Sequence, residues 1–200
     1  MNFAGEYRRI GSADVSALQA AVSALSDEDW SINSGRQQVY KVHAHTQTIP
    51  LIFDSDMRHT TPTVHADFHR FQPLLQPMMD TIAGYFAANP PAGIGPGTRG
   101  HFQRLILVRL AGLASIGSHR DFGASLSRAH RIHLPLVTSE KALFAIAGDI
   151  RHLRPGEIWE INNRKAHAVR NDSGQPRIHA IFDYVLPGEI VSDPDGQLVA

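Results

Sequence analysis

The N-terminal half of the chain mixes helical and strand-like hydrophobic patterns. Residues 12–25 and residues 71–88 carry apolar side chains at intervals of three and four, which predicts an amphipathic helix in each segment. Ser12 is suited to cap the first of these helices. Alternating or continuous apolar runs predict two strands between the helices, at residues 39–45 and 49–54.

After a loop rich in glycine and proline at residues 89–100, the pattern becomes almost entirely strand-like. Short apolar or alternating runs, separated by turn signals, predict strands at 102–111, 131–137, 141–147, 157–161, 166–170 and 177–185. Many short strands at this spacing are typical of a sandwich, a barrel or a jelly roll. We therefore predict one mainly β domain with flanking helices over residues 1–200, with a mixed α/β part at 1–100 and a β core at 101–190.

Composition narrows the chemistry that this domain can perform. Its 200 residues contain no cysteine, which excludes disulfides, thiolate metal sites and cysteine nucleophiles. The 19 basic and 19 acidic side chains balance, so nothing in the net charge indicates nucleic acid or an anionic membrane as a partner. We expect a cytoplasmic protein with a small-molecule substrate, and the oligomeric state stays open.

One short motif carries a candidate metal site. On an extended backbone, His119 and Asp121 are two residues apart and point to the same side. A second imidazole from a later strand would complete a ligand set of two histidines and one carboxylate. His167 is well placed to supply it. This set leaves about three of six octahedral positions open, as a non-haem Fe(II) oxygenase requires.

Arg177 follows His167 by ten residues, after a turn that returns the chain on a neighbouring strand. Its planar guanidinium can bind a carboxylate through two parallel hydrogen bonds, which suits the distal carboxylate of 2-oxoglutarate. If Arg177 faces the site, the alternation of a strand places His179, Ile181 and Asp183 on the same inner face.

The C-terminal half resembles the aspartyl/asparaginyl β-hydroxylase family, including its bacterial relatives that hydroxylate free proline in the cis configuration. The matching pieces agree in order and spacing: 107–110, 119–121, 131–136, 155–159, His167 and 177–183. The resemblance implies a double-stranded β-helix, also called a cupin-like jelly roll, that uses Fe(II), 2-oxoglutarate as cosubstrate, and dioxygen. It implies that His119, Asp121 and His167 bind the iron and that Arg177 anchors the cosubstrate.

The resemblance also suggests residues that surround the metal. Arg131 and His133 match an Arg-x-His pair near the cosubstrate and substrate, and Arg109 matches an arginine that meets the substrate's carboxylate. Arg128 is a second candidate for substrate contact. These arginines favour a carboxylate-bearing substrate such as a free amino acid or its derivative, with the Asp or Asn side chain of a peptide as the close alternative.

Other interpretations remain open at this point. A second His-x-Asp motif, at residues 65–67, is not followed by a strand-rich segment with a histidine and an arginine at matching distances. A cupin-type isomerase or hydrolase that uses another divalent metal would share the jelly roll, and so would a non-catalytic ligand-binding module. Neither alternative needs an arginine that binds 2-oxoglutarate.

Overall fold

A computed structural model describes residues 3–33, 41–55, 61–192 and 198–199. Its strands are β1 (Tyr7–Ser12), β2 (Thr46–Phe53), β3 (Thr63–Val64), β4 (His101–Leu110), β5 (Ala114–His119), β6 (His130–Val137), β7 (Ala142–Ile146), β8 (Asp149–Arg151), β9 (Glu157–Ile161), β10 (His167–Asn171), β11 (Arg177–Val185), β12 (Val191–Ser192) and β13 (Leu198–Val199). Its helices are α1 (Ser16–Ser23), α2 (Asp27–Ser31), the 3₁₀ helix η1 (Lys41–His43), α4 (Ala66–Ala88) and α5 (Ala124–Arg128).

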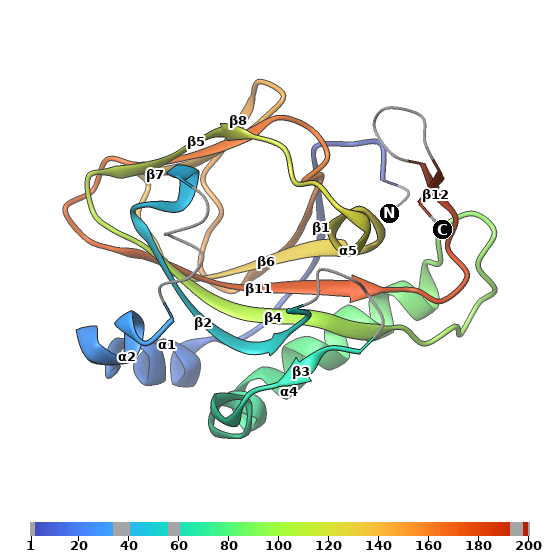
Figure 1. The fold of residues 1–200 in the computed structure, drawn as a ribbon, viewed down its shortest axis with the longest axis horizontal. Coiled ribbons are helices and arrows are strands. Elements are labelled where there is room, and N and C mark those ends of the chain that lie inside the picture. The colour runs from blue at the N-terminus through green and yellow to red at the C-terminus, as the bar shows by residue number, and fades with distance from the viewer. Residues whose placement is uncertain (1–2, 34–40, 56–60, 193–197, 200) are drawn as a thin grey trace.

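Two antiparallel sheets face each other and form the body of the molecule (Figure 1). The large sheet has seven strands in the order β1-β9-β6-β11-β4-β2-β3, and the small sheet has four in the order β5-β10-β7-β8. Strands β4, β6, β9 and β11 of one sheet alternate along the sequence with strands of the other. This mainly β jelly roll confirms the predicted fold class.

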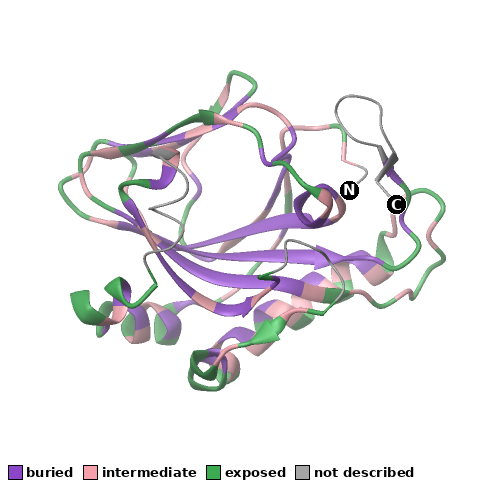
Figure 2. Ribbon diagram, viewed as in Figure 1, coloured by how far each residue is buried: buried purple, intermediate pink, exposed green. Residues whose placement is uncertain are grey.

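The outer face of the large sheet is covered by α1, α2 and α4, which all lie on one side in Figure 1. Apolar side chains from these helices and from the sheet form the main core, and include Leu18, Leu75, Phe86, Leu107 and Phe182. The central strands of this sheet are buried along most of their length (Figure 2). Both faces of these strands are therefore buried, although mainly the outer face is apolar.

The structure differs from the predicted elements at the N-terminus. Residues Tyr7–Ser12 form strand β1, which pairs with β9, although the sequence there is polar. The helix predicted from residue 12 begins at Ser16, so Ser12 ends a strand and the predicted cap is wrong. Asp14 accepts the main-chain N–H of Ser16 at 2.9 Å instead.

The other differences concern the segments around β2 and α4. Of the strand predicted at 39–45, residues 39 and 40 lie outside the described part of the chain, and Lys41–His43 form the 3₁₀ helix η1. Helix α4 begins earlier than predicted, at Ala66. Within the described residues, no helix combines the length and the apolar character needed to cross a membrane.

Candidate metal centre and pocket

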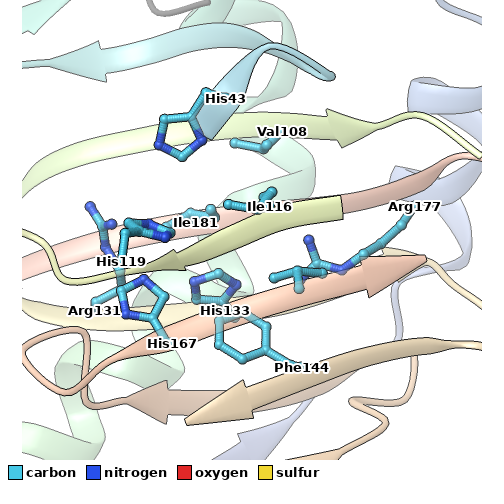
Figure 3. A pocket seen from close by; sticks show the side chains of 11 residues that line it. His43, Val108, Ile116, His119, Arg131, His133, Phe144, His167, Arg177 and Ile181 are labelled. Carbon is cyan, nitrogen blue, oxygen red and sulfur yellow. The ribbon is translucent and has the colours of Figure 1, made fainter. Parts of the chain in front are cut away.

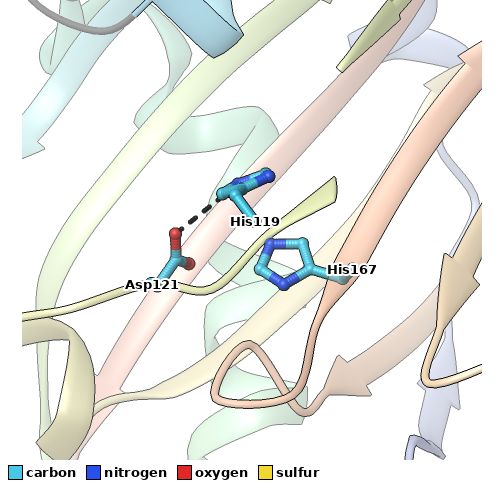
Figure 4. Close-up of side chains that lie close together, drawn as sticks. All are labelled: His119, Asp121 and His167. Atoms are coloured by element: carbon cyan, nitrogen blue, oxygen red, sulfur yellow. Dashed lines mark ion pairs between the residues drawn. The ribbon is translucent and has the colours of Figure 1, made fainter. Parts of the chain in front are cut away.

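Two strands of the small sheet bring two imidazoles together. His119 ends β5 and His167 begins β10; the two are partners in the strand register, and their ring centroids lie 4.2 Å apart. The main-chain N–H of Asp121 donates to the carbonyl of Asn163 at 3.0 Å, which holds the chain after β5 against the turn before β10. The potential ligand atoms of His119, Asp121 and His167 all lie within 4.8 Å of one another (Figure 4).

A β-bulge directs His119 toward this cluster. His167 is opposite His119 and Val169 is opposite Ile116, so β5 has one more residue than β10 between the two pairs. Because of this extra residue, Ile116 and His119 line the same pocket although they are three positions apart. In a regular strand, one of the two would point to the other face.

Hydrogen bonds to main-chain carbonyls orient both imidazoles. The Nδ1–H of His119 donates to Gly117 at 2.8 Å, and that of His167 donates to Lys165 at 3.0 Å. This arrangement leaves Nε2 of each ring as the metal-binding atom. Burial lowers the pKa of His167, which favours the neutral imidazole that binds metals. The donor set therefore fits a divalent cation with three open positions.

The carboxylate of Asp121 has two differently placed oxygens. Oδ1 lies 3.8 Å from Nε2 of His119. Oδ2 accepts hydrogen bonds from Arg131 and from the side-chain amide of Asn163. Burial alone would lower the pKa of Arg131, but the charges of Asp121 and Asp183 raise it above its ordinary value.

A second guanidinium lies at the other end of the pocket. Arg177 is 3% exposed, and its Nη2 donates to Nδ1 of His179 at 2.8 Å. In the described part of the chain it makes no ion pair, and burial lowers its pKa to about 9, so it remains protonated at neutral pH. A buried cation without a counter-ion is costly. Its environment therefore fits the distal carboxylate of a 2-oxo diacid.

The pocket connects these two ends (Figure 3). It is lined by His43, Val108, Ile116, His119, Arg131, His133, Phe144, His167, Val169, Arg177 and Ile181. Burial, and next the charge of Arg177, hold the pKa values of His133 and His179 well below the ordinary value, so both rings are neutral.

Strand β11 has the alternation that the sequence predicted. Ile178, Ala180 and Phe182 belong to the outer core. Arg177 and Ile181 line the pocket, and His179 and Asp183 contact pocket residues. The predicted inner face of this strand is thus confirmed.

Comparison with known proteins agrees with this geometry. Residues 95–187 match the family model described as aspartyl/asparaginyl beta-hydroxylase. The C-terminal part of the chain is therefore similar to that hydroxylase family. It contains all three candidate metal ligands, together with Arg131, His133 and Arg177. Family and site together make the chain an enzyme of the dioxygenase class.

Several solved structures share this fold at low sequence identity to this chain. An oxidoreductase of the 2OG-Fe(II) oxygenase family from Burkholderia pseudomallei is 14% identical, with a TM-score of 0.54, and 70% of this chain covers 67% of that one. A viral collagen prolyl hydroxylase from Paramecium bursaria Chlorella virus-1 is 10% identical, with a TM-score of 0.52 and coverage of 90% and 96%. A Pseudomonas putida prolyl-4-hydroxylase is 14% identical, with a TM-score of 0.50 and coverage of 91% and 92%. These similarities show the fold.

Two of the predicted site residues of the hydroxylase lie away from the pocket. Arg109 is on the outer face of β4, where it donates to Asp27 and Gln47 and lies over the Trp30 ring. The structure therefore places Arg109 away from the pocket, where it does not face the site expected for a substrate carboxylate. Arg128 ends α5, is half-buried, and is not among the residues that line the pocket.

The second His-x-Asp motif also lies outside the site. His65 precedes α4, and Asp67 is exposed in the first turn of that helix. Among the described residues, neither belongs to a cluster that could hold a metal.

One pocket residue beside the candidate ligands was not assigned a role in the site from the sequence. His43, in η1, is 7% exposed and lies edge-to-face against His119, with ring centroids 5.5 Å apart. The hydroxyl of Thr46 donates to the His43 carbonyl at 2.9 Å and so ties η1 to β2. His43 falls within the strand predicted at residues 39–45, and no spacing rule connects it with His119.

Proposed function

We propose that this chain is an Fe(II)- and 2-oxoglutarate-dependent hydroxylase in which His119, Asp121 and His167 hold the iron. The observation that carries the proposal is the pairing of two features in one pocket. A histidine–aspartate–histidine cluster with metal-ligand spacing lies at one end, and the buried, uncompensated guanidinium of Arg177 lies at the other. A chelating dicarboxylate is the ligand that complements both.

Each residue then has a definite task in the proposed reaction. With Fe(II) and 2-oxoglutarate bound, the site supplies oxidative decarboxylation of the 2-oxo acid by dioxygen, coupled to hydroxylation of a substrate C–H bond. Arg177 binds the distal carboxylate of the cosubstrate. The neutral ring of His133 lies between the two ends of the pocket, and the side chains of Ile116, Phe144 and Val169 exclude water from this part of it.

We propose an amino-acid-like small molecule as the substrate, with the Asp or Asn side chain of a peptide as the alternative. The substrate has to approach the metal on the side that the cosubstrate leaves open. His43 and Ile181 line the pocket near His119, away from Arg177 (Figure 3), and Val108 also lines the pocket. These side chains offer one polar ring among aliphatic groups, so we expect a compact substrate with few charges near the reacting carbon.

The test is succinate formation from 2-oxoglutarate with Fe(II) and ascorbate, across a panel of free amino acids and short peptides. We expect one panel member to stimulate succinate formation and to be hydroxylated, and the His167→Ala protein to remain at background. If no succinate forms above the metal-free control, even without substrate, the proposal is wrong. A cupin-type isomerase, hydrolase or binding module would then account better for the fold.

A further inference from the structure

Arg131 lies in the pocket, yet each nitrogen of its guanidinium donates to a carboxylate. Nε and Nη2 donate to the two oxygens of Asp183 at 2.8 and 2.7 Å, and Nη1 donates to Oδ2 of Asp121. Arg131 is 5% exposed and Asp183 is fully buried. Every nitrogen of this guanidinium therefore already has an anionic acceptor. Arg177, which has none, is the guanidinium that remains for an additional anion.

The same contacts fix the orientation of Asp121. Its Oδ2 accepts from both Arg131 and the side chain of Asn163, whose amide nitrogen is 3.1 Å away. Its main-chain N–H is bound to the Asn163 carbonyl, so the backbone is held as well. Only Oδ1 is directed toward the Nε2 atom of His119, as Figure 4 shows.

We infer that Arg131, itself held by Asp183, is a positioning residue that makes Asp121 present a single oxygen to the metal. This inference rests on the proposed metal site. If Oδ2 were released, the carboxylate of Asp121 could rotate away from the orientation in which Oδ1 faces His119, and the cation would lose a fixed ligand. Outer contacts of this kind orient metal ligands and commonly change metal affinity when they are removed.

The charges of the group agree with this role. Asp121 and Asp183 bring two negative charges and Arg131 brings one positive charge, so the cluster alone has one negative charge in excess. A divalent cation beside two neutral histidines reverses the excess to one positive charge. The near carboxylate of a chelating 2-oxo acid would then balance this positive charge.

The experiment compares metal affinity with stability. The variant Arg131→Met removes the guanidinium that binds both carboxylates, but it leaves Asp183 buried without its cation. The double variant Arg131→Met/Asp183→Asn removes that unpaired charge as well. Binding of Co(II) alone is measured by calorimetry, and thermal unfolding is followed without metal. We expect Co(II) affinity to fall by about 10- to 100-fold in both variants. Unfolding temperature should fall in the single variant and recover in the double variant.

Glu160→Gln is the matched control. Glu160 is also fully buried and binds an arginine, Arg8, and a histidine, His130. It lies beside the helix-covered face, since the ring of its partner His130 is 4.4 Å from that of Phe86. This control should lower the unfolding temperature and leave Co(II) affinity unchanged.

Three outcomes would distinguish a failure of the positioning role of Arg131 from a failure of the proposed metal site. Recovery of Co(II) affinity together with stability in the double variant would mean that Arg131 is only structural. Unchanged Co(II) affinity with weakened 2-oxoglutarate binding would mean that Arg131 is an anion anchor. Either result overturns the positioning role while the metal site stands. If His119→Ala bound Co(II) as tightly as the unaltered protein, the metal site itself would be wrong.

Discussion

The two faces of the large sheet are both buried, yet they differ in almost every other respect. On the outer face of β11, Ile178, Ala180 and Phe182 pack against apolar side chains of the helices and neighbouring strands. On the inner face of the same strand, Arg177 is buried against His179 and the Phe144 ring, and Asp183 is buried and paired with Arg131. One strand therefore contributes to two environments with different physical costs.

The outer face stabilises the fold by removing apolar area from water, at about 25 cal/mol per Å². The inner face places charges and imidazoles where water is scarce, which costs free energy unless each group is compensated. Arg131 and Asp183 compensate each other, whereas Arg177 is left without a carboxylate in the described residues. We attribute this uncompensated burial to function, because a buried cation without a counter-ion lowers the stability of the fold.

The largest effect is expected from the ligand carboxylate. Asp121→Ala should reduce succinate formation by roughly 10³-fold or more, since the three ligands act as a unit. The fold should persist, because Asp121 lies outside the apolar core. Asp172→Ala, which removes an exposed carboxylate paired with Arg170, is the control and should retain activity. Near-normal turnover by the Asp121→Ala protein would contradict the ligand assignment.

The outer face should show the reverse pattern. Phe182→Ala should lower the free energy of unfolding by about 3–5 kcal/mol, because it opens a cavity under the helices. Co(II) affinity of the folded protein should be unchanged. Chemical denaturation and calorimetry on the same sample measure both quantities. If the folded Phe182→Ala protein bound Co(II) much more weakly than the unaltered protein, the two faces would not be independent.

Arg177→Met should separate function from stability most clearly. Loss of charged hydrogen bonds worth about 1.5–3 kcal/mol should raise the KM for 2-oxoglutarate by roughly 10- to 100-fold. Removal of the buried cation should leave the free energy of unfolding unchanged or raise it by about 1 kcal/mol. A destabilised Arg177→Met protein with a normal KM would contradict the role given to Arg177.

The smallest effect concerns pH and the helix-covered face. His130 lies between Glu160 and Glu189, with Nδ1 and Nε2 at 2.6 and 2.8 Å from their carboxylates, and Arg8 also binds Glu160. Burial alone would lower the pKa of His130, but hydrogen bonds and charges of the two glutamates raise it above 6.5. The protonated ring therefore stabilises the fold fully below pH 6.5, and this contribution disappears as the pH rises through the folded pKa.

His130→Gln tests this linkage. The stability advantage of the unaltered protein over the variant should shrink as the pH is raised above 6.5, in denaturation curves measured at several pH values. An advantage that grows over the same range would show that the ring is neutral in the folded protein.

The sequence predicted the β pattern and much of the site because both depend on alternation. The inner face of β11 follows from a period of two, and the proposed metal ligands follow from His-x-Asp and a later histidine. The family resemblance and the spacing both selected Arg177, which lies in the pocket as expected.

What the sequence could not reveal depends on tertiary contacts. The extra residue in β5 that turns His119 toward Ile116 has no local signal, because bulges are set by pairing with the partner strand. Arg109 has the residue type of a substrate anchor, but the phase of β4 places it on the outer face with Asp27. His43 reaches the pocket from a segment that is distant in sequence, so only the folded chain places it beside His119.

The most direct test of the central claim, that the inner face binds Fe(II) and 2-oxoglutarate together, is an anaerobic absorption spectrum. Fe(II) and 2-oxoglutarate are added to the protein, and the visible charge-transfer band of the chelate is recorded for the unaltered protein, His167→Ala and Arg177→Met. We predict a band in the unaltered protein, none in His167→Ala, and a band in Arg177→Met only at higher 2-oxoglutarate concentration. No band in the unaltered protein, or an equal band in all three, would contradict the account.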